Sequence, residues 1–155
     1  FAHTVVDIDG IPCSCGRQGC IINYISIDHL LSEYIKQIKN GRYSTTLEKI
    51  DFDLNAISFD HFCSAVQSGD QLANEILKES AKYLAPGINN VIQILNPDII
   101  IFGGPIFRKC PGLFTLISGL LFGNQQVSTI LSMGELGADA VVVGAGSLVL
   151  EDFFG

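Results

Sequence analysis

The sequence predicts an α/β fold, and two observations support this prediction. Segments with apolar residues at helical spacing surround two short apolar runs rich in β-branched residues, at 98–102 and 127–131. The first run, D-I-I-I-F, is apolar on both faces, as expected of a strand buried in a sheet, and Gly103-Gly104-Pro105 follows it at once. Strand, glycine turn, helix, strand and helix in this order are typical of α/β proteins.

The first forty residues predict a short strand and then helices. Residues 4–6 form the expected strand, and 21–39 carry apolar side chains at helical spacing. Either Ser26 or Asp28 is placed to cap a second helix within that stretch. The dipeptide N-G at 40–41 ends it.

The middle of the chain predicts the longest helix. Residues 42–56 mix polar and apolar side chains and predict an irregular loop or a poor helix, after which Ser58 is a good N-cap for a short helix. Asp70 is placed to cap a long helix that runs to N-P at 96–97. Pro86 lies inside it, which predicts a kink or two helices in series. Two further helices are expected at 113–121 and 138–150.

Length and composition indicate one well-packed domain. The chain has 155 residues, of which 48% are hydrophobic and 16% charged. Its formal net charge of -7 argues against direct contact with nucleic acid, because an acidic surface repels phosphates. Neither a membrane span nor a secretory signal is evident, so we expect a cytoplasmic protein. The chain begins with Phe1 and has a candidate ligand at His3, which suggests a piece of a longer protein.

The most informative stretch is H-T-V-V-D-I-D-G-I-P-C-S-C-G-R-Q-G-C at 3–20. Cys13, Cys15 and Cys20 fall within eight residues, and His3 lies ten residues before the first of them. Thiolates and imidazole are the ligands of structural Zn²⁺ sites, and a set of four leaves no open position for a catalytic water. The glycines of the turn allow the backbone conformations that such a knuckle needs. The pattern predicts a structural zinc site.

Two alternatives use the same cysteines. One is a disulfide, although Cys13 and Cys15 are too close in sequence to pair comfortably, and pairing either with Cys20 leaves an odd thiol. The other is a set of free or redox-active cysteines. Cys63 and Cys110 are isolated in apolar surroundings. Zinc is the interpretation that we favour.

The pattern H-x9-C-x-C-G-x2-G-C resembles the zinc motif of the ROK family of bacterial sugar kinases and sugar-responsive repressors. The resemblance continues through S-G-D-Q-L-A-N-E-I-L, I-N-N-V-I-Q-I-L-N-P-D-I-I-I-F-G-G and G-A-D-A-V-V-V-G-A-G, so it covers nearly all of the chain. It implies an actin-like ATPase (ribonuclease H-like) fold. Residues 1–155 would be a single domain, the C-terminal lobe of a longer protein whose N-terminal winged helix and N-terminal sugar lobe lie outside this chain.

The resemblance also implies roles for single residues. In the family the zinc histidine can hydrogen-bond a bound sugar, which here is His3. The glycines that line the nucleotide cleft of the kinases correspond to Gly103 and Gly104. Two carboxylates bind sugar hydroxyls: one lies three residues before the zinc histidine, outside this chain, and the other corresponds to Ile22. This chain departs from the family pattern there, because isoleucine cannot accept a hydrogen bond.

Together these features predict the effector-binding and oligomerisation lobe of a sugar-responsive transcriptional regulator, most similar to the xylose- and N-acetylglucosamine-type repressors. We expect a homo-oligomer with a sugar or sugar phosphate as effector, and DNA contact only through the winged helix. The alternative is the C-terminal lobe of a ROK sugar kinase that phosphorylates a hexose with ATP. A third reading, favoured by Ile22, is an interaction lobe that has lost small-molecule binding. Under every reading this chain lacks the catalytic half.

Overall fold

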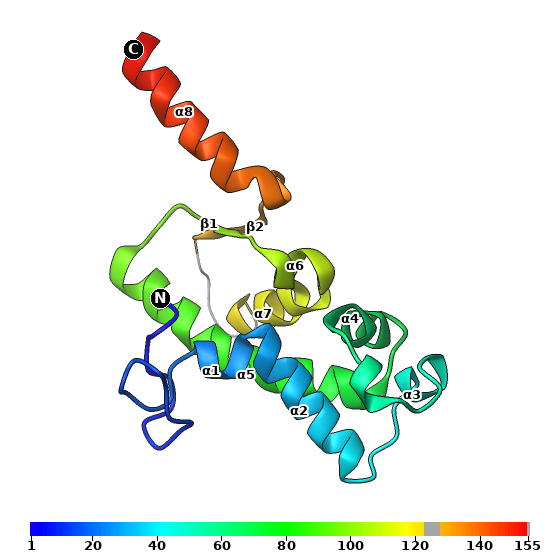
Figure 1. The fold of residues 1–155 in the computed structure, drawn as a ribbon. Helices are drawn as coiled ribbons and strands as arrows, with labels where there is room; N and C mark the ends of the chain where they lie inside the picture. The colour runs from blue at the N-terminus through cyan, green and yellow to red at the C-terminus, as the bar shows by residue number, and fades with distance from the viewer. Residues whose placement is uncertain (123–127, 155) are drawn as a thin grey trace.

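A computed structural model describes residues 1–122 and 128–154 and has an α/β fold dominated by helices (Figure 1). Its centre is one long helix, α5 (Gln71–Leu95). Four other helices pack around it: α1 (Ile22–Ile25), α2 (Ile27–Lys39), α4 (Phe59–Gln67) and α7 (Gly112–Phe122). The hydrophobic core therefore surrounds α5.

Helix α5 forms because it has a cap, a broad apolar stripe and a defined end. The Asp70 side chain accepts a hydrogen bond from Ala73 N at 2.9 Å, and Asn96 ends the helix in the left-handed conformation. Pro86 lies inside a single continuous element, so the expectation of two helices in series is wrong. Buried residues on both sides of the proline, Leu84 before it and Ile88 after it, hold the helix against the core.

The helices before α5 begin and end at the predicted residues. Ser26 ends α1 and caps α2 by accepting a hydrogen bond from His29 N at 3.2 Å, so Ser26 rather than Asp28 is the cap. Helix α2 ends at Lys39 with Asn40 as its C-cap, and Gly41 follows with φ +90°. Ser58 caps α4 in a capping box with His61. The stretch 42–56 contains only the short helices α3 (Thr46–Lys49) and η1 (Leu54–Ala56).

A buried carboxylate ties this loop to the start of α5. Asp70 accepts hydrogen bonds from Thr45 N at 2.8 Å and from the Ser44 hydroxyl at 3.0 Å, in addition to its capping bond from Ala73 N. The Tyr34 hydroxyl of α2 also hydrogen-bonds the Ser44 hydroxyl. One charged side chain thus connects α2, the loop and α5.

The two strands are parallel neighbours in a small sheet. Strand β1 (Ile99–Phe102) pairs with β2 (Ile130–Met133), with Ile99 opposite Ile130. Ile100 and Phe102 pack against the core, whereas Ile99 is 48% exposed and Ile101 is 64% exposed. The prediction of burial on both faces is therefore wrong within the described chain, because alternate residues point to opposite faces and the core covers only one.

Three other expectations about elements need correction. The strand expected at 4–6 is a single bridge between Val5 and Cys20. In the strand expected at 127–131, Val127 lies outside the described residues and β2 begins at Ile130. Helix α6 (Pro105–Lys109) was not expected; Pro105 occupies its first turn, where a missing backbone donor costs nothing.

The final segment contains η2 (Gly137–Asp139) and α8 (Ala140–Phe154), which extends away from the other helices (Figure 1). Four of the apolar side chains described in this helix are exposed: Val141 at 82%, Val142, Val143 and Leu148. In the part of the chain that the structure describes, no helix is both long enough and apolar enough to cross a bilayer.

The Asp70→Ala variant should lose about 2–4 kcal/mol of unfolding free energy, because it removes a helix cap and leaves two buried donors without an acceptor. Chemical denaturation measures the loss. Asp53→Ala, which removes the cap of the short η1 helix, is the matched control and should lose about 1 kcal/mol or less. Equal losses would contradict the role assigned to the Asp70 network.

The Asp70 contribution should also depend on pH. Burial opposes ionisation of this carboxyl, but hydrogen bonds from Ala73, Thr45 and Ser44 outweigh burial and lower its pKa. A folded-state pKa below the unfolded value stabilises the protein above the unfolded pKa of about 4, and this stabilisation is lost as pH falls through the folded pKa. The stability difference between wild type and Asp70→Ala should therefore shrink between pH 7 and pH 3.

Candidate metal centre

The candidate metal centre is built from the first residues of the chain, which form a folded-back loop. Gly19 N donates to Ile11 O at 2.9 Å, and Cys13 N donates to Arg17 O at 2.7 Å. Gly16 and Gly19 have φ of +87° and +65°, a left-handed conformation that favours glycine. These contacts return the chain beside itself and bring the three cysteines of the loop toward His3. We call residues 1–21 the metal loop.

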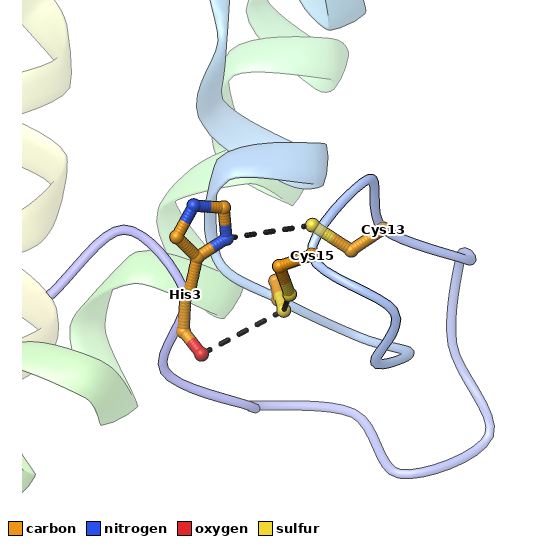
Figure 2. A group of neighbouring side chains, drawn as sticks. His3, Cys13 and Cys15 are labelled. Carbon is orange, nitrogen blue, oxygen red and sulfur yellow. Dashed lines mark hydrogen bonds between the residues drawn. The ribbon is translucent and has the colours of Figure 1, made fainter.

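The four predicted ligands come together in the structure. His3 Nδ1 lies 3.5 Å from Cys13 Sγ, Cys15 Sγ lies 3.6 Å from Cys20 Sγ, and all four ligand atoms lie within 4.8 Å of one another. Figure 2 shows the side chains of His3, Cys13 and Cys15 directed toward one another. A tetrahedral zinc ion with ordinary bond lengths requires nitrogen–sulfur and sulfur–sulfur separations of about 3.6 and about 3.8 Å. The cluster fits such an ion.

The cysteines of the cluster differ in their ionisation. Hydrogen bonds from the Arg17 backbone and guanidinium lower the pKa of the exposed Cys15 thiol to about 6. Burial raises the pKa of Cys20 to about 11, and this thiol donates to His3 O at 3.6 Å. A bound cation would favour the thiolate form of both. Arg17 was missed by the sequence analysis, although a cation two residues after a cysteine is a recognisable signal.

The disulfide alternative for the cysteines finds less support. All five cysteines are free, so the structure contains no disulfide at the loop. Cys63 and Cys110 lie in the hydrophobic core, in α4 and between α6 and α7. A hydrogen bond with Cys110 raises the pKa of Cys63. The core pair is therefore separate from the candidate metal centre.

The residues expected to face a sugar lie beside the metal loop. The His3 ring turns Nδ1 toward Cys13 and its other nitrogen away from that thiol (Figure 2). Ile22, the first residue of α1, is half-buried. The neighbouring Asn23 amide is oriented by the metal loop, because its Nδ2 donates to the carbonyls of Ile11 and Pro12 at 3.1 Å each.

Gly103 and Gly104 line a cavity of about 720 Å³ at the carboxyl ends of β1 and β2. Gly104 has φ +92°, and a Cβ added at either glycine would meet no atom within 4 Å. Gly134 and Arg108 line the same cavity. The structure thus places both predicted glycines at an open cavity with a nearby cation, and Arg108 was not anticipated because it lies in the unexpected helix α6.

Comparison with known proteins gives relatives of two kinds. The chain is 28% identical to a xylose repressor from Caldicellulosiruptor bescii, in an alignment that covers 97% of this chain and 38% of the repressor. It is 26% identical to a glucokinase from Thermotoga maritima, covering 97% of this chain and 49% of the kinase. The crystal structure of a ROK family glucokinase from Streptomyces griseus in complex with glucose and AMPPNP matches with a TM-score of 0.77 and 28% identity, covering 96% of this chain and 50% of that one.

These relatives agree on fold and family. ROK structures have an actin-like ATPase fold, so the predicted fold class is confirmed at that level. The chain spans between about a third and a half of the length of these relatives. The model of the ROK family matches residues 1–152. Because that match includes nearly every residue, this chain belongs to the ROK family.

Proposed function

We propose that this chain is the effector-binding and oligomerisation lobe of a sugar-responsive transcriptional regulator and carries a structural zinc ion. The observation that carries the proposal is the cluster of four ligands, His3, Cys13, Cys15 and Cys20, which matches a closed tetrahedral site. A closed site braces the chain instead of activating a water. The zinc ion would supply charge and fixed geometry to a loop that has little else to hold it.

The metal loop depends on such a brace because it has little core of its own. Phe1 is 59% exposed and Ile8 is 82% exposed, so these apolar side chains contribute little burial. When a loop cannot bury its apolar side chains, metal binding supplies much of its folding free energy. Thiolate ligands also suit the reducing environment of the cytoplasm, where we place this protein.

Ile22 favours a regulator over a kinase. Phosphoryl transfer requires the sugar hydroxyl to be held in line with the nucleotide, and small misplacements cost a kinase much of its rate. A regulator requires only that its effector bind two conformations with different affinities. Replacing a sugar-binding carboxylate by Ile22 is therefore more damaging to a kinase than to a regulator.

Partners of this lobe follow from its surface. The effector would be a sugar or a sugar phosphate that contacts the free nitrogen of His3, as in the family. Exposed apolar residues such as Ile101 and Val141 support burial of this surface in a homo-oligomer or against the rest of the protein. DNA would be contacted only by an N-terminal winged helix outside this chain, consistent with the net charge of -7.

The second candidate is the C-terminal lobe of a sugar kinase. It is favoured by the cavity at Gly103 and Gly104, where Arg108 supplies a positive charge at the carboxyl ends of the strands. Ligands of α/β proteins commonly bind at that edge. In this case the residues that activate the hexose hydroxyl would lie in the other half of the protein.

Two assays on the full-length protein distinguish the candidates. A regulator should bind DNA from its own upstream region, and one sugar of a panel should change that affinity about fivefold or more. Formation of ADP should not depend on sugar. Sugar-dependent ADP formation without DNA binding would instead identify a kinase and overturn the proposal.

The zinc site predicts different outcomes for two glycine variants. A Cβ at Gly19 would lie 1.5 Å from Asp7 O, whereas a Cβ at Gly16 would meet nothing within 4 Å. Both glycines have positive φ, so alanine introduces backbone strain in both variants. Elemental analysis should find about one zinc per chain in wild type and in Gly16→Ala, and much less in Gly19→Ala. Equal zinc contents in the two variants would contradict this site.

Restoring the acidic residue tests the sugar site. Ile22→Glu should tighten binding of the effector sugar by roughly tenfold, because a carboxylate would again accept a hydrogen bond from a sugar hydroxyl. Ile22→Leu keeps an apolar side chain and is the control, with unchanged affinity expected. Calorimetric titration with the sugar panel measures both. An unchanged affinity in Ile22→Glu would show that this position does not face the sugar.

A further inference from the structure

We propose that Asn23 and Tyr24 of α1 act as a clamp that holds the metal loop in register for its metal ion. This inference deepens the zinc site proposed above and rests on it. Neither residue is a metal ligand. They are positioning residues, because their side chains grip the backbone of Ile11 and Pro12 directly before the ligand Cys13.

The Tyr24 hydroxyl makes two contacts with the loop. It accepts a hydrogen bond from Ile11 N at 3.1 Å and donates one to Asp7 Oδ2 at 3.2 Å. Burial raises the pKa of Tyr24, so the phenol stays protonated and able to donate. The backbone at Gly10 runs so close that a Cβ there would lie 2.0 Å from the Tyr24 hydroxyl oxygen.

Asn23 holds the other backbone polar group of the same residue, Ile11. Its Nδ2 donates to Ile11 O and to Pro12 O, each at 3.1 Å. Ile11 O also accepts from Gly19 N, directly before the ligand Cys20. Both backbone polar groups of Ile11 are thus held by side chains of α1, and one contact continues to the returning part of the loop.

The clamp is anchored in the core through an aromatic pair. Tyr24 is buried, and its ring stacks on Tyr83 of α5 with centroids 3.9 Å apart and planes inclined by 16°. Helix α5 is the central helix of the fold, so Tyr24 connects the metal loop to the element around which the other helices pack. The metal loop has few apolar contacts of its own that could attach it to the core.

This arrangement has a direct consequence for the metal. A shift of Ile11 would carry Cys13 away from His3, whose Nδ1 lies only 3.5 Å from the Cys13 sulfur. Metal sites tolerate ligand displacements of only about half an ångström, and residues that orient ligands typically change metal affinity 10- to 100-fold. The clamp should therefore mainly slow the rate at which the metal ion is released.

The test compares metal release from four proteins loaded with zinc and mixed with an excess of a coloured chelator. Tyr24→Phe keeps the ring stack but removes both hydroxyl contacts, and it should release zinc roughly tenfold faster than wild type. Asn23→Ala should also release zinc faster than wild type, and it leaves the stack of Tyr24 on Tyr83 intact. Tyr83→Phe is the matched control, because it keeps the stack and changes no hydrogen bond to the loop in the part of the chain that the structure describes.

Two further measurements separate positioning from folding. Cobalt-loaded Tyr24→Phe should keep the absorption spectrum of a tetrahedral thiolate site, which shows that the fold and ligands survive. Amide hydrogen exchange at Ile11 should become faster in this variant, because its acceptor is gone. These readouts do not depend on any activity of the protein.

The outcomes distinguish the clamp from the zinc site. A wild type that binds neither zinc nor cobalt overturns the zinc site and the clamp together. Metal binding by all four proteins with equal release rates overturns the clamp alone. Faster release from Tyr83→Phe by the same factor as from Tyr24→Phe also overturns it, because the effect would then come from the aromatic pair and not from the hydroxyl.

Discussion

The metal loop buries few side chains apart from Cys13, Cys20 and Ile21, and this constraint explains the arrangement around it. Residues 1–21, all of them described, include no helix and contribute apolar side chains such as Ile8 to solvent. Conformational entropy opposes any single geometry for such a segment. Backbone hydrogen bonds, two left-handed glycines and polar side chains of α1 supply the order that burial does not. The four candidate ligand atoms, which lie within 4.8 Å of one another, are the point on which these contacts converge.

Asp70 also holds a loop in place by hydrogen bonds, but it does so as a buried side chain. Like Tyr24, it joins a loop to α5 through several hydrogen bonds from a single side chain. Because Asp70 is a buried charge, each of those bonds also satisfies a group that would be costly to leave unpaired. The long helix thus carries two attachments, a polar one at its N-cap Asp70 and an aromatic one at Tyr83, and both loops depend on its packing in the core.

Local chemistry made part of this structure predictable from sequence. The grouping of His3 with Cys13, Cys15 and Cys20 followed from residue type and spacing. The caps at Ser26, Ser58 and Asp70 followed from the preference of helix N-termini for side-chain acceptors. Contacts between distant residues were not accessible in this way. The exposure of Ile101 depends on what covers the sheet, and Tyr24 meets Ile11 only because the loop folds back over α1. A tyrosine at helical spacing gives no sign of such a contact.

Asn23 shows why a substitution next to a site cannot be judged by chemical similarity alone. In isolation its amide could accept a hydrogen bond in place of the carboxylate that Ile22 lacks. In the structure the amide nitrogen is committed to two carbonyls of the metal loop, and turning it toward a sugar would release the segment before Cys13. Because the amide nitrogen of Asn23 donates to two carbonyls of the metal loop, the loop fixes the orientation of this side chain, and its amide oxygen is the group left to accept a further hydrogen bond.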